Sequence, residues 1–448
     1  MAEIAPFRAV RYTAARGRLL GQLLAPPYDL VSEEKRDELL RLSPHNIIHL
    51  TLGEDRPGDG PATTNRYLRA AELWSSWLAQ GITRRDPTPA LYPLEQSFWA
   101  PDGRNLSRRG FVAAVRLHEF SEGVIVAHEK TLVAPKVDRL ELLKAVKANL
   151  SPIFGLYRDE EGATAHLLEA AIQPEILAEA DSDDGVHHRL WRTEKPEVVK
   201  GFQDLLASKR IFLADGHHRY ETALAYRRLL EEQHPGLPAD GGHHYILMFL
   251  CPMNDPGLFL FATHRLVHGV EGFSLAGFLE RLGRYFSVET LAEDIRRPAG
   301  RAWAISKLGE HAGRSTTFLV VTAEDQRARI ATLRDDADLS PAGLPANQTL
   351  AALDVTVLHS LVLEHVLGLS PEAQEKQENV RFVRDAGEAV NRVLSGEHAV
   401  GFLLNPTPMW QVEAVGEAGE TMPQKSTLFY PRLMAGLVMR DVDPRERP

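Results

Sequence analysis

The segment that most constrains this chain is a short apolar run followed at once by a polar turn and a helical pattern. The run is Ile211-Phe212-Leu213-Ala214, the turn is Asp215-Gly216-His217-His218-Arg219, and helical spacing continues over residues 219–232. An apolar run that ends in such a turn predicts a buried strand leading into the N-terminus of a helix. This strand–helix unit is typical of α/β folds, which gather their binding groups at strand ends.

The predicted turn has the residue types that bind an anion. A helix N-terminus presents free backbone N–H groups and a partial positive charge. Gly216 lets the backbone or a ligand approach closely, and the planar guanidinium of Arg219 suits a phosphate. His217 and His218 add donors near the same point. We therefore predict a phosphate-binding site at Gly216, His217, His218 and Arg219.

Asp215 does not fit this site simply, because a carboxylate repels a phosphate. We interpret it as a Mg²⁺ ligand, as a partner that orients a histidine, or as a group that binds a hydroxyl. One alternative is a capped helix with Asp215 as the N-cap and exposed histidines. Another is a metal site, but His217 and His218 are adjacent, so they point in different directions and do not easily share one ion.

The composition is that of an ordinary globular protein. Its 448 residues are too many for one compact core, so we expect two or three domains. With 44% hydrophobic residues the chain has enough apolar material to fill these cores. The net charge of -10 and the lack of a long Lys/Arg run argue against a nucleic-acid partner, because phosphate neutralisation dominates that affinity.

The sequence also predicts a cytoplasmic protein with no membrane partner. Residues 1–7 lack the pattern of a signal peptide, and no apolar stretch reaches the length of a membrane span. The single cysteine, Cys251, cannot form an internal disulfide, so the fold does not depend on an oxidising compartment. Cys251 ends an apolar run that starts at Tyr245, and we interpret it as a buried strand residue rather than a nucleophile.

The pattern along the chain predicts three regions. In residues 1–88, a rigid Pro26-Pro27 turn precedes a helix that starts at Ser32, and a second helix covers residues 62–79. In residues 89–268, the Asp102-Gly103 pair predicts a hairpin. The two strands of the hairpin are expected at residues 90–98 and 110–117. Further strands are expected at residues 124–126, 211–214, 245–250 and 258–262, and helices at residues 138–148 and 219–232. In residues 269–448 we expect a helix at 275–282, strands at 302–305, 316–321 and 399–404, and two further helices.

A second polar motif, His128-Glu129-Lys130-Thr131, follows the strand expected at residues 124–126. A glutamate at a strand end can act as a general base towards a hydroxyl. The alternative is a solvated loop acid. Lys136, Asp138 and Arg139 follow, and they either line a pocket or pair on the surface, which is the commoner arrangement.

Two further motifs are weaker signals. Asn149 and Ser151 link a helix to a strand and are by default backbone caps. The Thr263-His264-Arg265 triplet ends another strand, where α/β sites gather.

The segment Met422-Pro423-Gln424-Lys425-Ser426-Thr427 precedes a predicted helix, so Lys425 and Ser426 would either contact an anion or cap that helix. Its end resembles a P-loop, with Gly419 at the first glycine position. However, Gln424 replaces the second glycine and Pro423 lacks a backbone donor that the loop needs. We therefore reject a P-loop.

Together these motifs resemble a widespread prokaryotic family of proteins of unknown function and similar length. The resemblance runs through most of the chain, at Ala25-Pro26-Pro27-Tyr28-Asp29, Ser43-Pro44-His45-Asn46, His128–Thr131, Asn149–Tyr157, Ala214–Tyr220, Thr263–Arg265 and Met422–Thr427.

The central part also resembles the ParB/sulfiredoxin-like superfamily, where a short strand leads into a Gly-x-x-Arg turn that opens a helix and holds nucleotide phosphates. Residues 216–219 match that pattern. Free-serine kinases are the most similar members, since they pair a His-Glu segment with an Asp-Gly-His-His-Arg segment. This chain is much longer than the minimal kinases, has His217 or His218 where sulfiredoxin has a cysteine, and lacks the DNA-binding helical domain of ParB.

This resemblance implies that Glu129 deprotonates the substrate hydroxyl, that Asp215 positions the substrate or the metal, and that residues 216–219 hold the phosphates. The expected site residues are Glu129, Asp215 and His218 as catalytic; Gly216, His217, His218, Arg219, Lys425 and Ser426 as phosphate-binding; His128, Lys130, Asn149, Ser151, His264 and Arg265 as substrate-binding; and Asp215 as the metal ligand.

The expected fold is α/β (α+β), with a central ParB/sulfiredoxin-like mixed-sheet core in residues 89–268 and additional α/β regions in residues 1–88 and 269–448. The expected function is a phosphotransferase for a small hydroxylated metabolite, free serine or phosphoserine above all, with Mg²⁺ and with ATP, ADP or pyrophosphate as the donor. The alternatives are a ParB-like nucleotide-binding regulator without kinase activity and a metal-dependent phosphatase or hydrolase.

Overall fold

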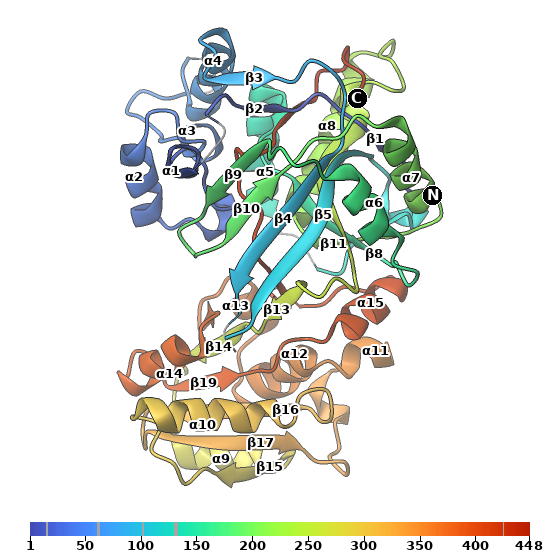
Figure 1. Cartoon of the computed structure of the whole chain (residues 1–448). Coiled ribbons are helices and arrows are strands. Elements are labelled where there is room, and N and C mark those ends of the chain that lie inside the picture. Colours follow the sequence, from blue (N-terminus) through green and yellow to red (C-terminus); the bar gives the residue numbers. More distant parts are fainter. Residues whose placement is uncertain (15–16, 61–62, 101–102, 130–132, 424) are drawn as a thin grey trace. The chain divides into compact units, whose positions relative to one another are not determined.

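The computed structural model describes all 448 residues except 15–16, 61–62, 101–102, 130–132 and 424. The chain forms two compact units, which we call unit 1 and unit 2 (Figure 1). Unit 1 consists of Met1–Ala127, Thr131–Phe259 and Pro431–Pro448, and unit 2 of His128–Lys130 and Leu260–Tyr430.

The centre of unit 1 is a nine-stranded mixed sheet. Its strands follow the order β6-β11-β8-β12-β5-β4-β10-β9, with β1 paired to β5. The β6–β11 and β8–β12 pairs are parallel and the others antiparallel, so the predicted α/β class with a central mixed sheet is confirmed. The strands are β1 (Ile4–Ala5), β4 (Tyr92–Trp99), β5 (Asn105–Arg116), β6 (Ile125–Val126), β8 (Ile153–Tyr157), β9 (Ala178–Asp181), β10 (His187–Leu190), β11 (Ile211–Asp215) and β12 (Tyr245–Pro252).

The hairpin predicted around Asp102-Gly103 is confirmed as β4 and β5, which pair antiparallel with Leu94 opposite Gly110. Asp102 lies outside the described residues, and Gly103 has a φ of 82°. Such a backbone conformation favours glycine. Cys251 lies in β12 with no exposed surface, as predicted for a buried strand residue.

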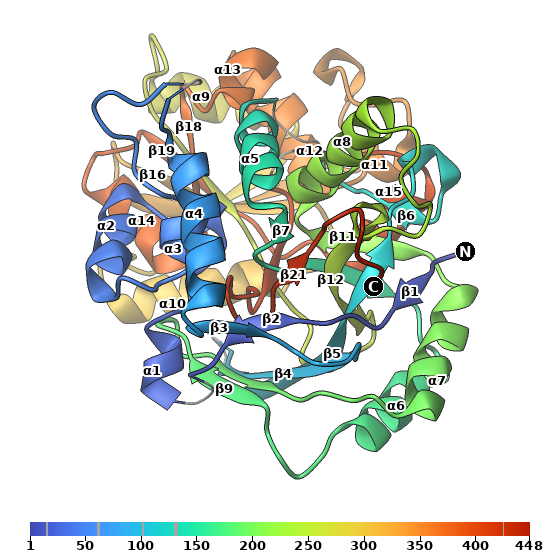
Figure 2. The same ribbon diagram turned by 90° about the horizontal axis from the view of Figure 1, so that it is seen from above.

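One face of the sheet packs against helices. Phe202 of α7 and Leu224 of α8 share a core cluster with Phe111 and Met248 of the sheet. On this side α5 lies beside α8, and α4 beside α5 (Figure 2). The helices are α4 (Arg66–Ala79), α5 (Val133–Val146), α6 (Ala163–Ala171), α7 (Pro196–Ala207) and α8 (His217–Gln233).

The remaining elements of unit 1 are small. Ser32 caps α2 by accepting a hydrogen bond from the Lys35 N–H, as its position in the sequence predicts. The helix expected over residues 62–79 begins later, because Asn65 caps α4 and sets its start. The other elements are β2 (Val10–Tyr12), α1 (Gly17–Gly21), η1 (Tyr28–Leu30), α2 (Glu33–Leu42), α3 (Ile48–Thr51), β3 (Thr83–Arg85), η2 (Phe120–Glu122), β7 (Ala148–Asn149), η3 (Gly242–His244) and β21 (Arg440–Asp441). Strand β13 (Phe259–Phe261) spans the boundary between the two units.

Unit 2 has a six-stranded antiparallel sheet in the order β15-β17-β16-β19-β14-β18. Its strands are β14 (His264–Val267), β15 (Phe286–Thr290), β16 (Thr317–Thr322), β17 (Arg327–Leu333), β18 (Val380–Val383) and β19 (Val400–Leu403). Strand β20 (Leu428–Tyr430) pairs with β13 outside this sheet. The helices are α9 (Leu275–Leu282), α10 (Pro298–Gly309), η4 (Ser340–Ala342), α11 (Gln348–Ala351), α12 (Asp354–Val357), the π-helix η5 (Leu358–Val366), α13 (Pro371–Glu375), α14 (Ala386–Leu394) and α15 (Met409–Glu417).

Helix α9 covers the residues predicted for it, but the strand predicted at residues 302–305 is wrong. These residues lie inside α10, which begins at Pro298. Proline is favoured at the first position of a helix, and Ala304 and Leu308, four residues apart, both face the core.

The predicted regions and the observed units differ in extent. Residues 1–88 lie in unit 1 together with most of residues 89–268, and residues 269–430 lie in unit 2. The division into three regions stays a prediction. Among the described residues, no helix is both long and apolar enough to cross a membrane.

Candidate functional site

The predicted strand–turn–helix segment is confirmed as β11, Gly216 and α8. Gly216 is the N-cap of α8 and has a φ of 93°. A Cβ at this position would lie 2.6 Å from Ile153 Cγ2, so a larger residue does not fit. The alternative in which Asp215 caps the helix is wrong, because Asp215 is the last residue of β11. The glycine therefore allows both the left-handed backbone of the turn and the close packing of Ile153 against it.

Asp215 is held between two arginines. Its Oδ2 accepts a hydrogen bond from Arg219 Nη2 at 2.7 Å, and its Oδ1 accepts one from Arg432 Nη1. Burial alone would raise the pKa of Asp215, but the two guanidinium groups lower it to about 2. Asp215 is therefore a permanent anion inside a cationic cluster.

Arg219 contacts two other predicted site residues. Its Nη1 donates to Ser151 Oγ at 2.8 Å and to the Pro152 carbonyl at 2.9 Å, while its Nη2 reaches Asp215. The structure thus brings Asp215, Arg219 and Ser151 together. Asn149 lies nearby in sequence, but its Oδ1 accepts the Leu247 N–H at 3.0 Å, which is a structural contact between strands.

Sequence reasoning missed Arg432 and Arg108. Arg108 is fully buried, lies 4.5 Å over the Phe154 ring, and donates to the Pro431 carbonyl and to Gln96. Burial lowers the pKa of Arg108 to about 10, so it stays charged at neutral pH. Neither arginine belongs to a recognisable motif, and only the proximity of residues far apart in sequence reveals them.

The two histidines of the turn differ in exposure. His217 is 7% exposed, and burial lowers its pKa to about 4, so it is neutral at pH 7. The alternative with two exposed histidines is therefore wrong for His217. His218 is partly exposed.

The surroundings of Asp215 are cationic: each of its carboxylate oxygens accepts a hydrogen bond from an arginine. The role of Asp215 as a Mg²⁺ ligand stays a prediction. Among the residues that the structure describes, no group of three His, Cys, Asp or Glu side chains is placed to hold a metal. We derive no chemical step through a protein-bound metal.

The other predicted site residues lie in unit 2, where two distant segments meet. Glu129 pairs with Met422 as an isolated parallel β-bridge, and Glu129 Oε1 accepts the Lys425 N–H at 3.1 Å. The His128 ring Nε2 lies 2.9 Å from Thr427 Oγ1. The His-Glu motif and the 422–427 segment are therefore neighbours, although Lys130 and Gln424 lie outside the described residues.

The helix predicted after residue 427 is wrong. Residues 428–430 form β20, and Pro431 directly after it cannot donate to a strand or helix. Lys425 has a φ of 56°, and Ser426 Oγ donates to the Pro423 carbonyl at 2.5 Å. Lys425 and Ser426 therefore do not stand at a helix N-terminus, and their phosphate-binding role stays a prediction.

His264 and Arg265 are buried in unit 2. His264 Nδ1 accepts the Leu404 N–H at 3.3 Å, and burial lowers the pKa of His264 to about 4. Arg265 donates to the Lys425 carbonyl at 3.2 Å, and burial lowers its pKa to about 9, against the opposing effect of Glu129. Arg265 thus supports the segment that contacts Glu129. The substrate-binding roles of both residues stay predictions.

Glu129 belongs to unit 2 and Asp215 to unit 1. A pocket shared by these two carboxylates stays a prediction.

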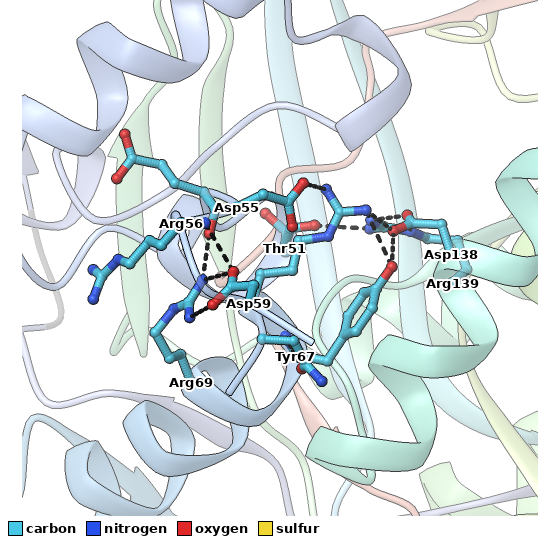
Figure 3. Close-up of polar contacts among 11 residues, drawn as sticks. Thr51, Asp55, Arg56, Asp59, Tyr67, Arg69, Asp138 and Arg139 are labelled. Atoms are coloured by element: carbon cyan, nitrogen blue, oxygen red, sulfur yellow. Dashed lines mark hydrogen bonds and ion pairs between the residues drawn. The ribbon is translucent and has the colours of Figure 1, made fainter. Parts of the chain in front are cut away.

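A network of polar contacts in unit 1 centres on Asp138 (Figure 3). Asp138 on α5 accepts hydrogen bonds from Arg66 at 2.7 Å, from the Tyr67 hydroxyl at 2.8 Å and from Arg139 Nε at 2.7 Å. Arg139 Nη1 also donates to the Thr51 carbonyl at 2.9 Å. The network ties α4 and the end of α3 to α5, and it fixes the Arg139 side chain.

Three comparisons relate the chain to known proteins. The family model described as a protein of unknown function (DUF1015) matches residues 4–356. No curated protein sequence matches the chain. Matches among solved structures include a free serine kinase in complex with AMP, which is 12% identical with a TM-score of 0.35 over 73% of this chain and 91% of that chain.

Two further solved structures match at a similar level. A conserved hypothetical protein from Pyrococcus furiosus is 13% identical with a TM-score of 0.34, covering 70% of this chain and 91% of its own. SbnI with a C-terminal truncation, from Staphylococcus aureus, is 12% identical with a TM-score of 0.32, covering 73% of this chain and 81% of its own.

Proposed function

We propose that this chain, which belongs to the DUF1015 family, is a phosphotransferase that acts on a small hydroxylated metabolite. Free serine or phosphoserine is the best candidate, with a nucleotide or pyrophosphate as the phosphoryl donor. The observation that carries the proposal is the turn at Gly216, where the N-terminus of α8 meets a largely buried cluster of Arg219, Arg432 and Asp215.

The charges of this cluster favour a phosphate. The guanidinium groups of Arg219 and Arg432 both contact Asp215 beside the N-terminus of α8. That N-terminus adds a partial positive charge and backbone N–H donors, while His217 is neutral at pH 7. Guanidinium groups next to a helix N-terminus favour a phosphate.

In the proposed reaction, Glu129 accepts the proton of the substrate hydroxyl while the hydroxyl oxygen attacks the terminal phosphorus of the donor. A new P–O bond to the substrate forms, and the bond to the leaving phosphate oxygen breaks. Gly216, His217, His218 and Arg219 hold the transferred phosphoryl group, and Asp215 keeps Arg219 in place. The roles of His128, Lys130, Asn149, Ser151, His264, Arg265, Lys425 and Ser426 in binding substrate or phosphate belong to the same proposal.

A phosphotransfer screen tests the proposal. ATP, ADP, CTP and pyrophosphate are crossed with L-serine and related hydroxylated metabolites in the presence of Mg²⁺, and phosphoserine is incubated alone. Glu129→Gln keeps an oxygen that can accept the Lys425 N–H, and Arg219→Ala removes the guanidinium at the turn. Arg228→Ala is the matched control, because Arg228 lies on the same helix but is largely exposed.

We expect turnover that is abolished in Glu129→Gln and Arg219→Ala and retained in Arg228→Ala. Turnover that survives in both of the first two variants would overturn the assigned roles. If no turnover occurs in any combination but nucleotide binding is lost in Arg219→Ala, the chain is a nucleotide-binding regulator and the phosphotransferase proposal fails.

A further inference from the structure

A small cavity of about 70 Å³ lies in unit 1 next to Arg219. Its walls include residues from α5 and from three of the motifs that the sequence singles out, namely residues 25–29, 149–157 and 214–220. The polar residues that line it are Tyr28, Thr51, Arg139, Asn149, Ser151, Arg219 and Thr222. The rest of the lining is apolar, and it contains no Asp or Glu.

Two of the residues that line this cavity, Thr222 and Tyr28, carry hydroxyl groups. Thr222 is 3% exposed, and its Oγ1 has no hydrogen-bond partner among the described residues. A buried hydroxyl without a partner is unfavourable, so a native protein that keeps one invites an explanation. Burial, and then Asp29, raise the pKa of Tyr28 to about 12, so its phenol is neutral and can donate.

The two cations at the cavity are held in place. Arg139 lies 4.2 Å over the Tyr28 ring and donates to Asp138 and Thr51, and Arg219 donates to Ser151. Arg139 is paired with Asp138 and Arg219 with Asp215, but neither carboxylate lines the cavity. A guanidinium group has five N–H donors, so each arginine can donate to a ligand as well as to its carboxylate partner. Together with the apolar lining, these donors favour an anionic ligand with a compact apolar part.

The loop that carries Tyr28 is also fixed before any ligand binds. The Asn46 side chain is buried and donates to the carbonyls of Gln22 and Leu24. Ala25 exchanges backbone hydrogen bonds with Ala435, which also lines the cavity. A site whose groups are already ordered binds its ligand with a smaller loss of entropy. These contacts also give a structural reason for the Ser43–Asn46 motif.

We propose that this cavity binds the phosphoryl acceptor, and that the acceptor is a small hydroxylated compound with a carboxylate. The inference rests on the proposed function, because only a phosphotransferase has a phosphoryl acceptor. Arg219 belongs both to the turn that would hold the phosphate and to the cavity wall, so a molecule in the cavity lies next to the phosphoryl group. A nucleotide base is separated from the terminal phosphate by its sugar and the intervening phosphate groups, and so does not fit this position.

The test is a calorimetric titration of the full chain with D-glycerate, L-serine and glycerol, and separately with ADP. Glycerol carries hydroxyl groups but no carboxylate. Thr222→Val keeps the shape of the side chain and removes the hydroxyl, and Tyr28→Phe removes only the phenolic oxygen. Thr356→Val is the matched control, because Thr356 is also buried in a helix with an unpartnered hydroxyl but belongs to unit 2.

We expect at least one of the two acids to bind and glycerol to bind weakly or not at all. Thr222→Val and Tyr28→Phe should each weaken acid binding about tenfold, as expected for a lost hydrogen bond to a charged group. Thr356→Val should bind the acids as tightly as the wild type does. The affinity for ADP should stay unchanged in all three variants. Thr222→Val should not lower the melting temperature, since the hydroxyl it removes has no partner in the protein.

The inference is overturned if neither acid binds, if glycerol binds as well as the acids, or if Thr222→Val and Tyr28→Phe bind the acids like the wild type. Failure of the proposed function gives a different result. In that case the acids bind and Thr222→Val weakens their binding, but the phosphotransfer screen shows no product with any donor. The cavity would then be a binding site for small acids without a phosphoryl transfer.

Discussion

Asp215 Oδ2 lies 2.7 Å from Arg219 Nη2, across the turn that Gly216 makes between β11 and α8. This contact explains why an acid stands beside a predicted phosphate site. Asp215 holds the guanidinium of Arg219 from one side while Ser151 and the Pro152 carbonyl hold it from the other. The carboxylate therefore orients a cation instead of meeting the phosphate directly.

The pair of Asp215 and Arg432 should be strongly coupled in stability. Both side chains are largely buried, so Arg432→Met breaks a close ion pair while Arg219 still pairs with Asp215, and we expect a loss of about 3 kcal/mol of unfolding free energy. In the double variant with Asp215→Asn, the loss should be smaller than the sum of the two single losses, because each single variant already breaks the same ion pair. Urea unfolding of the two single variants and the double variant measures the coupling.

Asp204→Asn serves as the control for this cycle. Asp204 pairs with Lys200 on an exposed face, so its loss should change stability by less than about 0.5 kcal/mol. Strictly additive effects of Asp215→Asn and Arg432→Met would show that the two side chains do not interact.

Gly216→Ala should be more harmful than an alanine at another glycine with a similar backbone. Gly216 and Gly58 have φ values of 93° and 91°, but a Cβ at Gly58 meets nothing within 4 Å, whereas one at Gly216 meets Ile153. We expect Gly58→Ala to cost about 1 kcal/mol from the backbone alone and Gly216→Ala to cost about 2 to 4 kcal/mol and to weaken ADP binding. Equal losses of stability and ADP affinity in both variants would contradict a special role of the Gly216 turn.

His217 should make the stability of the chain depend on pH. Its folded pKa is about 4, below the value of about 6.5 in an unfolded chain, so the unfolded state takes up a proton that the folded state does not. The free energy of unfolding that His217 contributes by staying neutral is fully present above pH 6.5, and it is lost as the pH falls towards 4. Between pH 7 and pH 5 we expect the wild type to lose about 2 kcal/mol more than His217→Gln.

Urea unfolding at the two pH values measures this difference. His234→Gln is the matched control, because His234 follows the end of α8 and is exposed. The same pH dependence in wild type and His217→Gln would show that His217 is not held neutral in the fold.

Asp138→Asn should weaken the network that fixes Arg139 (Figure 3). Asp138 accepts hydrogen bonds from three side chains and is mostly buried, so we expect a loss of about 1 to 2 kcal/mol. Asp55→Asn is the control, because Asp55 reaches Arg66 at 3.4 Å and is 70% exposed, and it should cost less than about 0.5 kcal/mol. Thermal unfolding of both variants checks the difference. Equal losses would mean that the buried contacts of Asp138 contribute no more to stability than the exposed contact of Asp55.

Local elements were predictable where a few adjacent residues decide the structure. The hairpin at Gly103, the cap at Ser32 and the helix over 275–282 depend on turn chemistry, capping and spacing that lie within one short segment. The strand predicted at residues 302–305 is wrong because a short apolar run is compatible with both a strand and a helix. In unit 2 the packing of Ala304 and Leu308 in the core stabilises the helix. The strand that replaces the predicted helix after residue 427 was decided by its pairing with β13, which no local pattern indicates.

The sequence by itself determined the strand, the glycine turn and the helix at residues 211–233, because apolar periodicity and the need for a left-handed backbone are local properties. Only the tertiary structure decided which side chains surround that turn. Arg432 reaches Asp215 across a separation of 217 residues, and Tyr28 and Thr222 line one cavity from distant segments. Such contacts follow from the packing of the whole unit, and a single sequence carries no local signal for them.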